Sequence, residues 1–527
     1  MTLDQKVQSR LVLLHNGNIT HSHNCDITGP AIGTLAGMLL DPSISHCFIA
    51  GNNLYETLAE LNALIQGNIS GWRMRISNRR RQAITYDGQK RIVGRFFVDY
   101  FAIDHKRSRD ERSPRRRYDV INLELFKDKP PEDPAIQMQM ALTILRMAES
   151  RGVKFRGTRG SIANAMLKAS PRWEDDRHAA PYFINRESRK VLPGNFYSVS
   201  NLVKTAHPLG GIPRAYYIDQ SSAHHNIART VPLPHPNHIR ARGHYKRALK
   251  GEFAKWCTPD SEVGLQLMNG EHIGLVKCRL QIATLGKGLE HLYPPWASKR
   301  GTIDTWLWTP ELRLIVGDQK IQLECFIAAY TATISDPVLP EYARWALGEL
   351  KAHEHPEYIK ATLLAAYGIL AFNSDNGPLY RYWGGNNTKS KVEIPLAGVV
   401  GETEIKLPKH VQMNTVNVAA RGVIEAETRT RSIEYARELN AMGIHIPQIY
   451  ADGILAETDQ LPFIPDGWRV SHELSNVYIP RVNAIVSDSL VKLPGVSGGS
   501  KGEWQDRGRD ARRVLRATYA RAYTAGT

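Results

Sequence analysis

The chain has 527 residues, and its 68 Lys and Arg against 52 Asp and Glu leave a formal charge of +16. Hydrophobic residues make up 42% of it, enough to bury a sizeable core, which excludes a wholly disordered, collagen-like or low-complexity chain. The longest apolar stretch, residues 361–372, is well short of the ~20 residues that span a bilayer, so no membrane partner is expected. The charge favours a polyanionic partner, nucleic acid first, with solubility alone as the alternative explanation.

The expected compartment is a reducing one, the cytoplasm. The cysteines show no C-x-x-C spacing, which argues against a disulfide framework or a zinc ribbon. Residues 1–18 lack the unbroken apolar segment of a signal peptide. The five cysteines are Cys25, Cys47, Cys257, Cys278 and Cys325.

The first 150 residues mix short strands with helix candidates at residues 54–65 and 136–151. His21, His23 and Cys25 alternate along one strand and could bind zinc, but no fourth ligand stands at a familiar spacing, so a structural role is favoured. Along the whole chain, strands and helices interleave without a repeating βαβ rhythm, which predicts an α+β fold.

Three arginine-rich runs, at residues 73–81, 105–117 and 507–521, concentrate the positive charge. The first two lie in or beside predicted strands, and the third has helical spacing. Each run alone is more often a solvated face. Three runs in one chain favour a channel that contacts phosphates.

Residues 215–228, AYYIDQSSAHHNIA, predict a strand that ends at Asp219 and a short helix that Ser221 and Ser222 could cap. A carboxylate at a strand end, before a tight turn into a helix, is well placed to hold a cation. The alternative is an ordinary turn residue or helix cap.

Residues 356–372 predict a helix on which Lys360 and Tyr367 share one face. A single cation among apolar neighbours suits a helix that grips a triphosphate. An ordinary core helix, with a lysine that reaches out to water, is the equal alternative.

Residues 446–457, IPQIYADGILAE, predict a hairpin with Asp452-Gly453 at its turn. Asp-Gly is also simply what such a turn prefers. The order of the three segments is what points to a function. A strand-end carboxylate, a lysine helix and a hairpin carboxylate are the layout of a polymerase palm with a fingers helix between its two acidic segments. Nucleotidyl transfer needs such carboxylates to hold two divalent cations.

These segments resemble the family B DNA polymerases, most closely the small protein-primed phage type. YIDQSSAHH is similar to the family's D-x-x-S-L-Y-P segment and KATLLAAYG to its K-x-x-x-N-S-x-Y-G helix, while IYADGILAE occupies the place of the Y-x-D-T-D-S hairpin. The resemblance covers about residues 150–500. It implies metal ligands at Asp219 and Asp452, with two Mg²⁺ ions as cofactor and Mn²⁺ as the alternative ion.

The resemblance also implies nucleotide-binding and DNA-binding residues. LPGNF stands where the family has a template-binding segment, and WRVSHE (468–473) and VKLPGV (491–496) resemble palm and thumb positions. The implied nucleotide-binding residues are Ser222, His224, Lys360, Tyr367 and Gly368, and the implied DNA-binding residues are Gly194, Asn195, Phe196, Tyr450 and Lys492.

The sequence departs from the family pattern at four places. His224 replaces the tyrosine that excludes ribonucleotides, and Ala365-Ala366 replaces the Asn-Ser pair of the helix. The second hairpin carboxylate falls on Ile454, so either Asp452 takes its role through a shifted turn, or Glu457 or Asp459 helps, or catalysis is impaired. The thumb K-x-Y has no clear match, the nearest being residues 482–484.

The N-terminal part would correspond to a proofreading exonuclease that has lost its activity. Residues 48–58 resemble the second exonuclease motif, with Glu56 in place of Asp, but there is no D-x-E near the start and no acidic residue at the expected place in the helix of residues 136–146. Two-metal exonuclease chemistry needs about four acidic ligands.

The expected architecture is therefore α+β, a right-hand polymerase fold of palm, fingers and thumb behind an exonuclease-like, RNase H-like domain. The expected domains are residues 1–150 (degenerate 3′–5′ exonuclease-like domain), 151–335 (first part of the palm with an inserted subdomain), 336–385 (fingers), 386–480 (insert and second part of the palm) and 481–527 (thumb and basic C-terminal helix).

The expected activity is template-directed transfer of nucleotides from dNTPs to a primer 3′-hydroxyl, in phage or mobile-element replication with proofreading lost. The implied partners are template-primer DNA, dNTPs and a terminal protein or another replication protein, in the bacterial host cytoplasm for a phage-encoded protein. One alternative is a catalytically impaired polymerase fold that binds nucleic acid. The other is a primase-like polymerase that accepts ribonucleotides.

Overall fold

The computed structural model forms two compact units, each described here on its own. Unit 1 comprises Met1–Trp173 and Ala346–Met413, and unit 2 comprises Glu174–Trp345 and Asn414–Thr527. No helix among the described residues is both long and apolar enough to cross a membrane. The described residues are 11–15, 18–21, 24–30, 46–51, 72–76, 84–85, 94–100, 116–123, 126, 131–155, 159–171, 197–199, 212–285, 289, 292–298, 300–370, 380–383, 402–405, 417–450, 452–477, 479 and 485–492.

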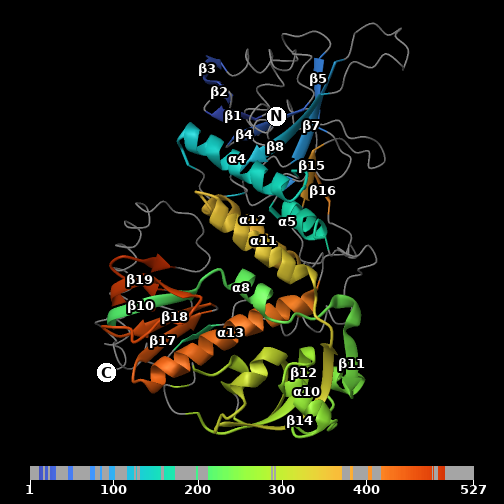
Figure 1. Cartoon of the computed structure of the whole chain (residues 1–527), viewed down its shortest axis with the longest axis vertical. Coiled ribbons are helices and arrows are strands. Elements are labelled where there is room, and N and C mark those ends of the chain that lie inside the picture. The colour runs from blue at the N-terminus through green and yellow to red at the C-terminus, as the bar shows by residue number, and fades with distance from the viewer. Residues whose placement is uncertain are drawn as a thin grey trace. The chain divides into compact units, whose positions relative to one another are not determined.

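A seven-stranded sheet forms the centre of unit 1 (Figure 1). β1 pairs in parallel with β4, and β4 pairs in parallel with β8, while the other neighbours pair antiparallel. In spatial order the strands are β3 (Asn24–Pro30), β2 (Asn18–His21), β1 (Leu11–His15), β4 (His46–Gly51), β8 (Arg116–Asn122), β7 (Gly94–Tyr100) and β5 (Trp72–Ile76).

Helix α4 (Pro134–Ser150) packs on β1 and β4. It begins at Pro134, whose fixed φ suits the first helical position, and the side chain of Asp133 accepts a hydrogen bond from the Ala135 N–H at 2.7 Å. The prediction of a helix at residues 136–151 is confirmed. The helix candidate at residues 54–65 lies outside the described residues.

Two further helices of unit 1 pack against α4 or against each other: α5 (Arg159–Lys168) and α12 (Glu357–Leu370). α12 confirms the helix predicted at residues 356–372. Helix α11 (Val338–Ala352) precedes it in the chain. A small sheet of unit 1 joins β6 (Ile84–Thr85), β15 (Tyr380–Trp383) and β16 (Glu402–Ile405).

The main sheet of unit 2 is antiparallel throughout. β10 confirms the strand predicted to end near Asp219, and β17 and β18 confirm the predicted hairpin. Its turn differs from the prediction, because Gly453 is already a strand residue that pairs with Tyr450 and only Asp452 of the Asp-Gly pair lies in the turn. In spatial order the strands are β19 (Trp468–Val477), β10 (Ile212–Gln220), β18 (Gly453–Glu457), β17 (His445–Tyr450) and β9 (Tyr197–Val199).

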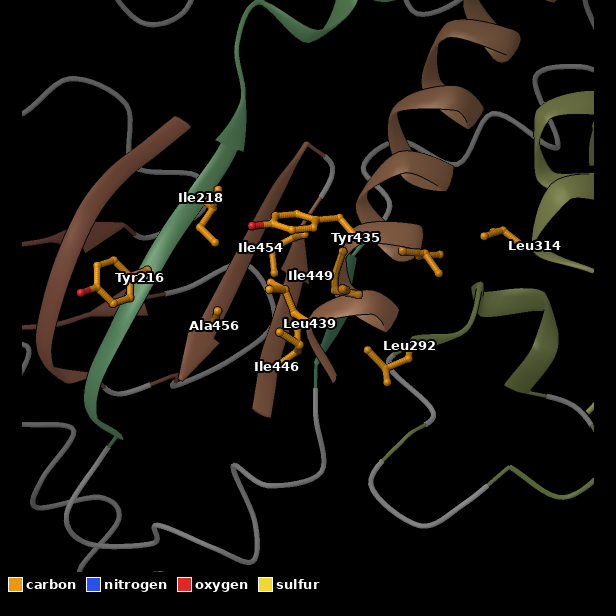
Figure 2. Packing of buried hydrophobic residues seen from close by; sticks show 12 residues of the cluster. Tyr216, Ile218, Leu292, Leu314, Tyr435, Leu439, Ile446, Ile449, Ile454 and Ala456 are labelled. Carbon is orange, nitrogen blue, oxygen red and sulfur yellow. The ribbon is translucent and has the colours of Figure 1, made fainter. Parts of the chain in front are cut away.

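Helix α13 (Val418–Ala441) covers one face of this sheet. Its side chains Ile433, Tyr435 and Leu439 share a buried apolar cluster with residues of β10, β17 and β18 (Figure 2). Such a face, fully removed from water, stabilises the sheet by about 1.5–3 kcal/mol for each large apolar side chain. The helix therefore fixes which face of each strand is buried, and which is left for other contacts.

An insert of unit 2, between β10 and α11, forms a four-stranded antiparallel sheet. It contacts α13 through the short 3-10 segment η5 (Thr309–Leu314) and through Trp308. A Cβ on Gly422 would meet the Trp308 ring at 2.0 Å, so only glycine permits this approach of helix and insert. The strands, in spatial order, are β11 (Arg240–Gly243), β14 (Ile321–Ala332), β12 (Ile273–Ile282) and β13 (Gly301–Trp308).

Candidate active site

The hairpin places Asp452 beside Asp219. In the antiparallel register of β10 and β18, Asp219 pairs with Gly453, and the Gln220 N–H donates to the Asp452 carbonyl at 2.9 Å. Asp219 and Asp452, the two predicted metal ligands, are more than two hundred positions apart in the sequence. The pairing of β10 with β18 brings them to the same end of two neighbouring strands. The side chain of Gln220 points to the opposite face, where it donates to the Thr428 carbonyl and to Ser432 of α13.

The carboxylate of Asp219 is bound by two side chains of β19. Arg469 donates from Nε to Oδ1 at 2.9 Å and from its second terminal nitrogen to Oδ2 at 3.2 Å, and the Ser471 hydroxyl donates to Oδ1 at 2.5 Å. The hydrogen bond to Asp219 raises the pKa of Arg469, and the charges of Asp219 and Asp452 add to this effect. A bidentate pair of this kind is among the stronger charge-assisted contacts.

Tyr217 lies on the same face as Asp219, two residues earlier in β10. Burial raises the pKa of its phenol, and the charges of Asp452 and Asp219 raise it further. A Cβ on Gly453 would meet the Tyr217 hydroxyl oxygen at 2.5 Å. Glycine is therefore required at the first position of β18 because the Tyr217 ring packs directly on it.

The turn from β10 into α8 (Ala223–Thr230) passes through Ser222, which has a φ of 48° in the left-handed region. Such a conformation costs about 1 kcal/mol or more for a residue other than glycine. Ser222 occupies the N-cap position, which confirms the predicted place of the helix start, but its side chain makes no capping hydrogen bond. Instead, the Ser221 N–H donates to the Gly467 carbonyl at 2.7 Å and ties the turn to the start of β19.

His224 lies on the first turn of α8, and its Nε2 is 3.4 Å from Oε1 of Glu425 on α13. Arg421 forms an ion pair with the same carboxylate. Burial would raise the pKa of Glu425, but the hydrogen bond from His224 and the charges of Arg421 and Arg429 outweigh it and lower that pKa to about 2. His224 is thus held against α13 by an ionised carboxylate.

Ile454, the position of the missing second hairpin carboxylate, is fully buried in the cluster under α13 with Ile218 and Ile449 (Figure 2). Successive side chains of a strand point to opposite faces, and Ile454 follows Gly453, which pairs with Asp219. Ile454 therefore faces the core, away from Asp219. Glu457 is four residues further along β18, about 13 Å from Gly453, and bonds to His445 at 2.7 Å.

Asp219 and Asp452 are the carboxylates that could hold a divalent cation. Among the described residues, no group of three or more His, Cys, Asp or Glu side chains is arranged to hold a metal ion. Oxygen ligands are what Mg²⁺ prefers, and it commonly keeps several waters beside one or two carboxylates. The metal-ligand roles of Asp219 and Asp452 therefore stay a prediction, and among the described residues no third acidic side chain joins them.

Three predicted nucleotide-binding residues lie on α12, in unit 1. Lys360 is exposed, Tyr367 is 1% exposed within the helical core of that unit, and a Cβ on Gly368 would meet nothing within 4 Å. Their nucleotide-binding role stays a prediction.

The predicted DNA-binding residues are placed only in part. Tyr450 ends β17, where it pairs with Gly453, and Lys492 belongs to the two-residue strand β21 (Val491–Lys492). Gly194, Asn195 and Phe196 lie outside the described residues, as do Glu56, His23 and the basic run 507–521.

The sequence alone does not single out Arg469, Ser471 or Tyr217 as site residues. Residues 468–473 resemble only a palm segment. The available signal was the spacing Arg469–Ser471 in a strand, since residues two apart share a face. The register that sets Arg469 opposite Asp219, and the irregularity between Tyr217 and Ile218, arise only on pairing with β10.

The fold as a whole is similar to that of solved DNA polymerases. A structure described as phi29 DNA polymerase complexed with primer-template DNA and incoming nucleotide substrates matches with a TM-score of 0.56 and 14% identity, over 94% of this chain and 93% of that chain. Phi29 DNA polymerase complexed with single-stranded DNA matches with a TM-score of 0.51 and 14% identity, over 92% and 85%. No family model and no curated protein matches the sequence. The likeness is one of fold: a polymerase fold of mixed helix and sheet over most of the chain.

Proposed function

We propose that the chain is a template-directed DNA polymerase that extends a primer 3′-hydroxyl with dNTPs. The observation that carries this proposal is the meeting of Asp219 and Asp452 at one end of neighbouring antiparallel strands, within a fold like that of solved DNA polymerases. The excess of 68 basic over 52 acidic residues supports a nucleic-acid partner.

Asp219 and Asp452 would hold Mg²⁺, or Mn²⁺ as the alternative, and one such ion fits them better than two. When bound, the ion supplies Lewis-acid stabilisation of the charge that develops on the transferring phosphate. The chain's own residues set the geometry. Tyr217 packs on Gly453 and so fixes the hairpin turn, and the Gln220 N–H holds the Asp452 main chain.

The nucleotide would bind beside the turn from β10 into α8. The strained backbone of Ser222 is typical of functional sites, and the first N–H groups of a helix favour anionic ligands. Under this proposal His224, oriented by Glu425, lies beneath the sugar. The roles that the resemblance implies for Lys360, Tyr367 and Gly368 of unit 1, towards the triphosphate and the nascent base pair, are also part of this proposal.

The remaining parts take the roles that the sequence resemblance implies. The order of unit 1's sheet, three antiparallel strands followed by two parallel pairings, supports an RNase H-like domain of exonuclease type. The proposal includes the loss of proofreading in this domain and the assignment of fingers and thumb. It also includes a terminal protein as partner and a phage origin, with the protein acting in the host cytoplasm. The residues proposed to contact DNA are Gly194, Asn195, Phe196, Tyr450 and Lys492.

A second candidate function is a polymerase fold that binds nucleic acid without catalysis. Two observations favour it: Arg469 occupies both oxygens of Asp219, and Ile454 buries the position of the second hairpin carboxylate. A primase-like variant that accepts ribonucleotides is favoured by His224 alone, because a histidine held by Glu425 replaces the tyrosine expected beneath the sugar.

The test is primer extension by the full chain with Mg²⁺ or Mn²⁺, supplied with dNTPs or NTPs, with and without a primer. We expect Asp219→Asn to lower the extension rate about a thousandfold, because it removes a ligand worth several kcal/mol of transition-state stabilisation. Asp304→Asn is the matched control, since Asp304 pairs with Arg279 in the insert.

Each alternative has its own outcome. Extension that survives Asp219→Asn would show the site assignment to be wrong. A wild-type chain that binds template-primer DNA and extends nothing would support the non-catalytic candidate. Incorporation of NTPs without a primer would support the primase-like one.

A further inference from the structure

The carboxylate of Asp219 is already engaged by a positive charge. Arg469 contacts both carboxylate oxygens, at 2.9 and 3.2 Å, and Ser471 donates to one of them at 2.5 Å. A guanidinium in this bidentate position uses the lone pairs that an oxygen-liganded metal ion also needs. The two positive charges also repel each other at contact distance.

The Arg469 side chain can be displaced from the Asp219 carboxylate, whereas the Ser471 hydroxyl can remain bound to it. The side chain of Arg469 is 57% exposed and that of Asp219 is 20% exposed, so the guanidinium covers the carboxylate from the solvent side. Because the guanidinium lies mostly in solvent, the arginine can turn away from Asp219, but a cation must compete with a bidentate charge-assisted contact to displace it. The Ser471 hydroxyl comes from the same strand and can keep the carboxylate oriented after the arginine has left.

We propose that Arg469 is the exchangeable counter-ion of Asp219, which competes with the divalent cation for that carboxylate and so sets how readily the site takes up metal. This inference rests on the proposed function, since it assumes that Asp219 is a metal ligand. In the metal-free state the guanidinium neutralises Asp219. A cation binds Asp219 only as Arg469 turns away into solvent.

The experiment is a titration of the full chain with Mn²⁺ alone, with free Mn²⁺ followed by its electron paramagnetic resonance signal. We expect Arg469→Gln to tighten Mn²⁺ binding roughly fivefold to tenfold, because a bidentate charge-assisted contact no longer competes for the same carboxylate. Arg469→Lys retains the charge and is expected to stay near the wild-type affinity. Asp219→Asn in either background is expected to abolish the Mn²⁺ site.

The matched control is Arg214→Gln. Arg214 is also an exposed arginine on the pairing of β10 and β19, but it pairs with Glu473, at 3.7 Å, away from Asp219. The control loses the same unit of positive charge and is expected to bind Mn²⁺ as the wild type does. Equal tightening in Arg214→Gln and Arg469→Gln would mean that net charge alone is responsible, and would overturn the inference.

Failure of this inference is distinguishable from failure of the proposed function. If Asp219→Asn abolishes Mn²⁺ binding while Arg469→Gln leaves its affinity unchanged, Arg469 does not compete, and a metal-dependent polymerase still stands. If Mn²⁺ binds as expected but no variant extends a primer, the polymerase proposal fails and the counter-ion role stands. Mn²⁺ binding that is indifferent to Asp219→Asn overturns the inference outright.

Discussion

Glu425 shows how one residue can be placed by its charge. It lies on α13 between His224 of α8 and Arg421 one turn earlier on its own helix. Burial opposes ionisation, yet the hydrogen bond from His224 and the nearby cations lower the pKa of Glu425 to about 2. The carboxylate thereby holds the first turn of α8, directly after Asp219 and Ser222, in one position against α13.

The depressed pKa of Glu425 predicts an acid-dependent contribution to stability. Its pKa is about 2 in the fold against an ordinary 4.5, so the stabilisation is present above about pH 4.5 and is lost as the pH falls toward 2. Between pH 6 and pH 3, we expect the free energy of unfolding of the wild type to fall by about 2 kcal/mol more than that of Glu425→Gln. Urea unfolding at each pH measures this difference. Parallel pH profiles for the two proteins would contradict this prediction.

Helix α13 organises unit 2 at the scale of elements. One of its faces covers the sheet that bears Asp219 and Asp452, and it also contacts η5 of the insert. The buried ion pair between Arg429 and Glu311, at 3.1 Å, joins α13 to η5. Removal of either partner would strongly destabilise the fold, because it would leave the other charge buried without compensation. The position of the helix is thus determined by contacts with two sheets.

The start of α13 is anchored by Asn417. Its Oδ1 accepts from the Ala420 N–H at 3.1 Å, while its Nδ2 donates to the Pro234 carbonyl at 3.0 Å and to Asp336 at 3.2 Å. We expect Asn417→Ala to lower the free energy of unfolding by about 2–3 kcal/mol, from the lost cap and the buried acceptors left unpaired, measured by thermal or urea unfolding.

Asn417→Asp separates the two contributions. It keeps an acceptor for the helix cap but places a second carboxylate against Asp336, so we expect it to be at least as destabilising as alanine. An aspartate variant as stable as the wild type would show that the cap alone matters at this position.

The charge of the whole molecule bears on its partner rather than on its fold. An excess of +16 favours contact with phosphates, and the affinity for DNA then depends on released counterions. We expect binding to labelled template-primer DNA, followed by fluorescence anisotropy, to weaken about a thousandfold from 50 to 200 mM salt if about six phosphates are contacted. Binding that is insensitive to salt would contradict an electrostatic template-primer channel.

Local patterns in the sequence were sufficient to predict the elements that carry the candidate site. Alternation predicted β10, the Asp452-Gly453 pair predicted the hairpin, and helical spacing predicted α12. These features depend on neighbouring residues, whose backbone preferences act over a few positions. The left-handed backbone of Ser222 is not predicted, because the turn is held by the long-range hydrogen bond from the Ser221 N–H to the Gly467 carbonyl and has no signal in residues 221–223 alone.

The residue types and spacings of this chain thus determined β10, the hairpin of β17 and β18, the helices α4 and α12, and the two candidate carboxylates. The tertiary structure alone decided which side chains meet. Arg469 binds Asp219 across 250 positions of sequence, and Ile454 faces the core under α13 because the register of β10 and β18 sets the face of every residue in the pair. Register and burial are properties of paired strands, and a one-residue shift would reverse them without changing any local pattern.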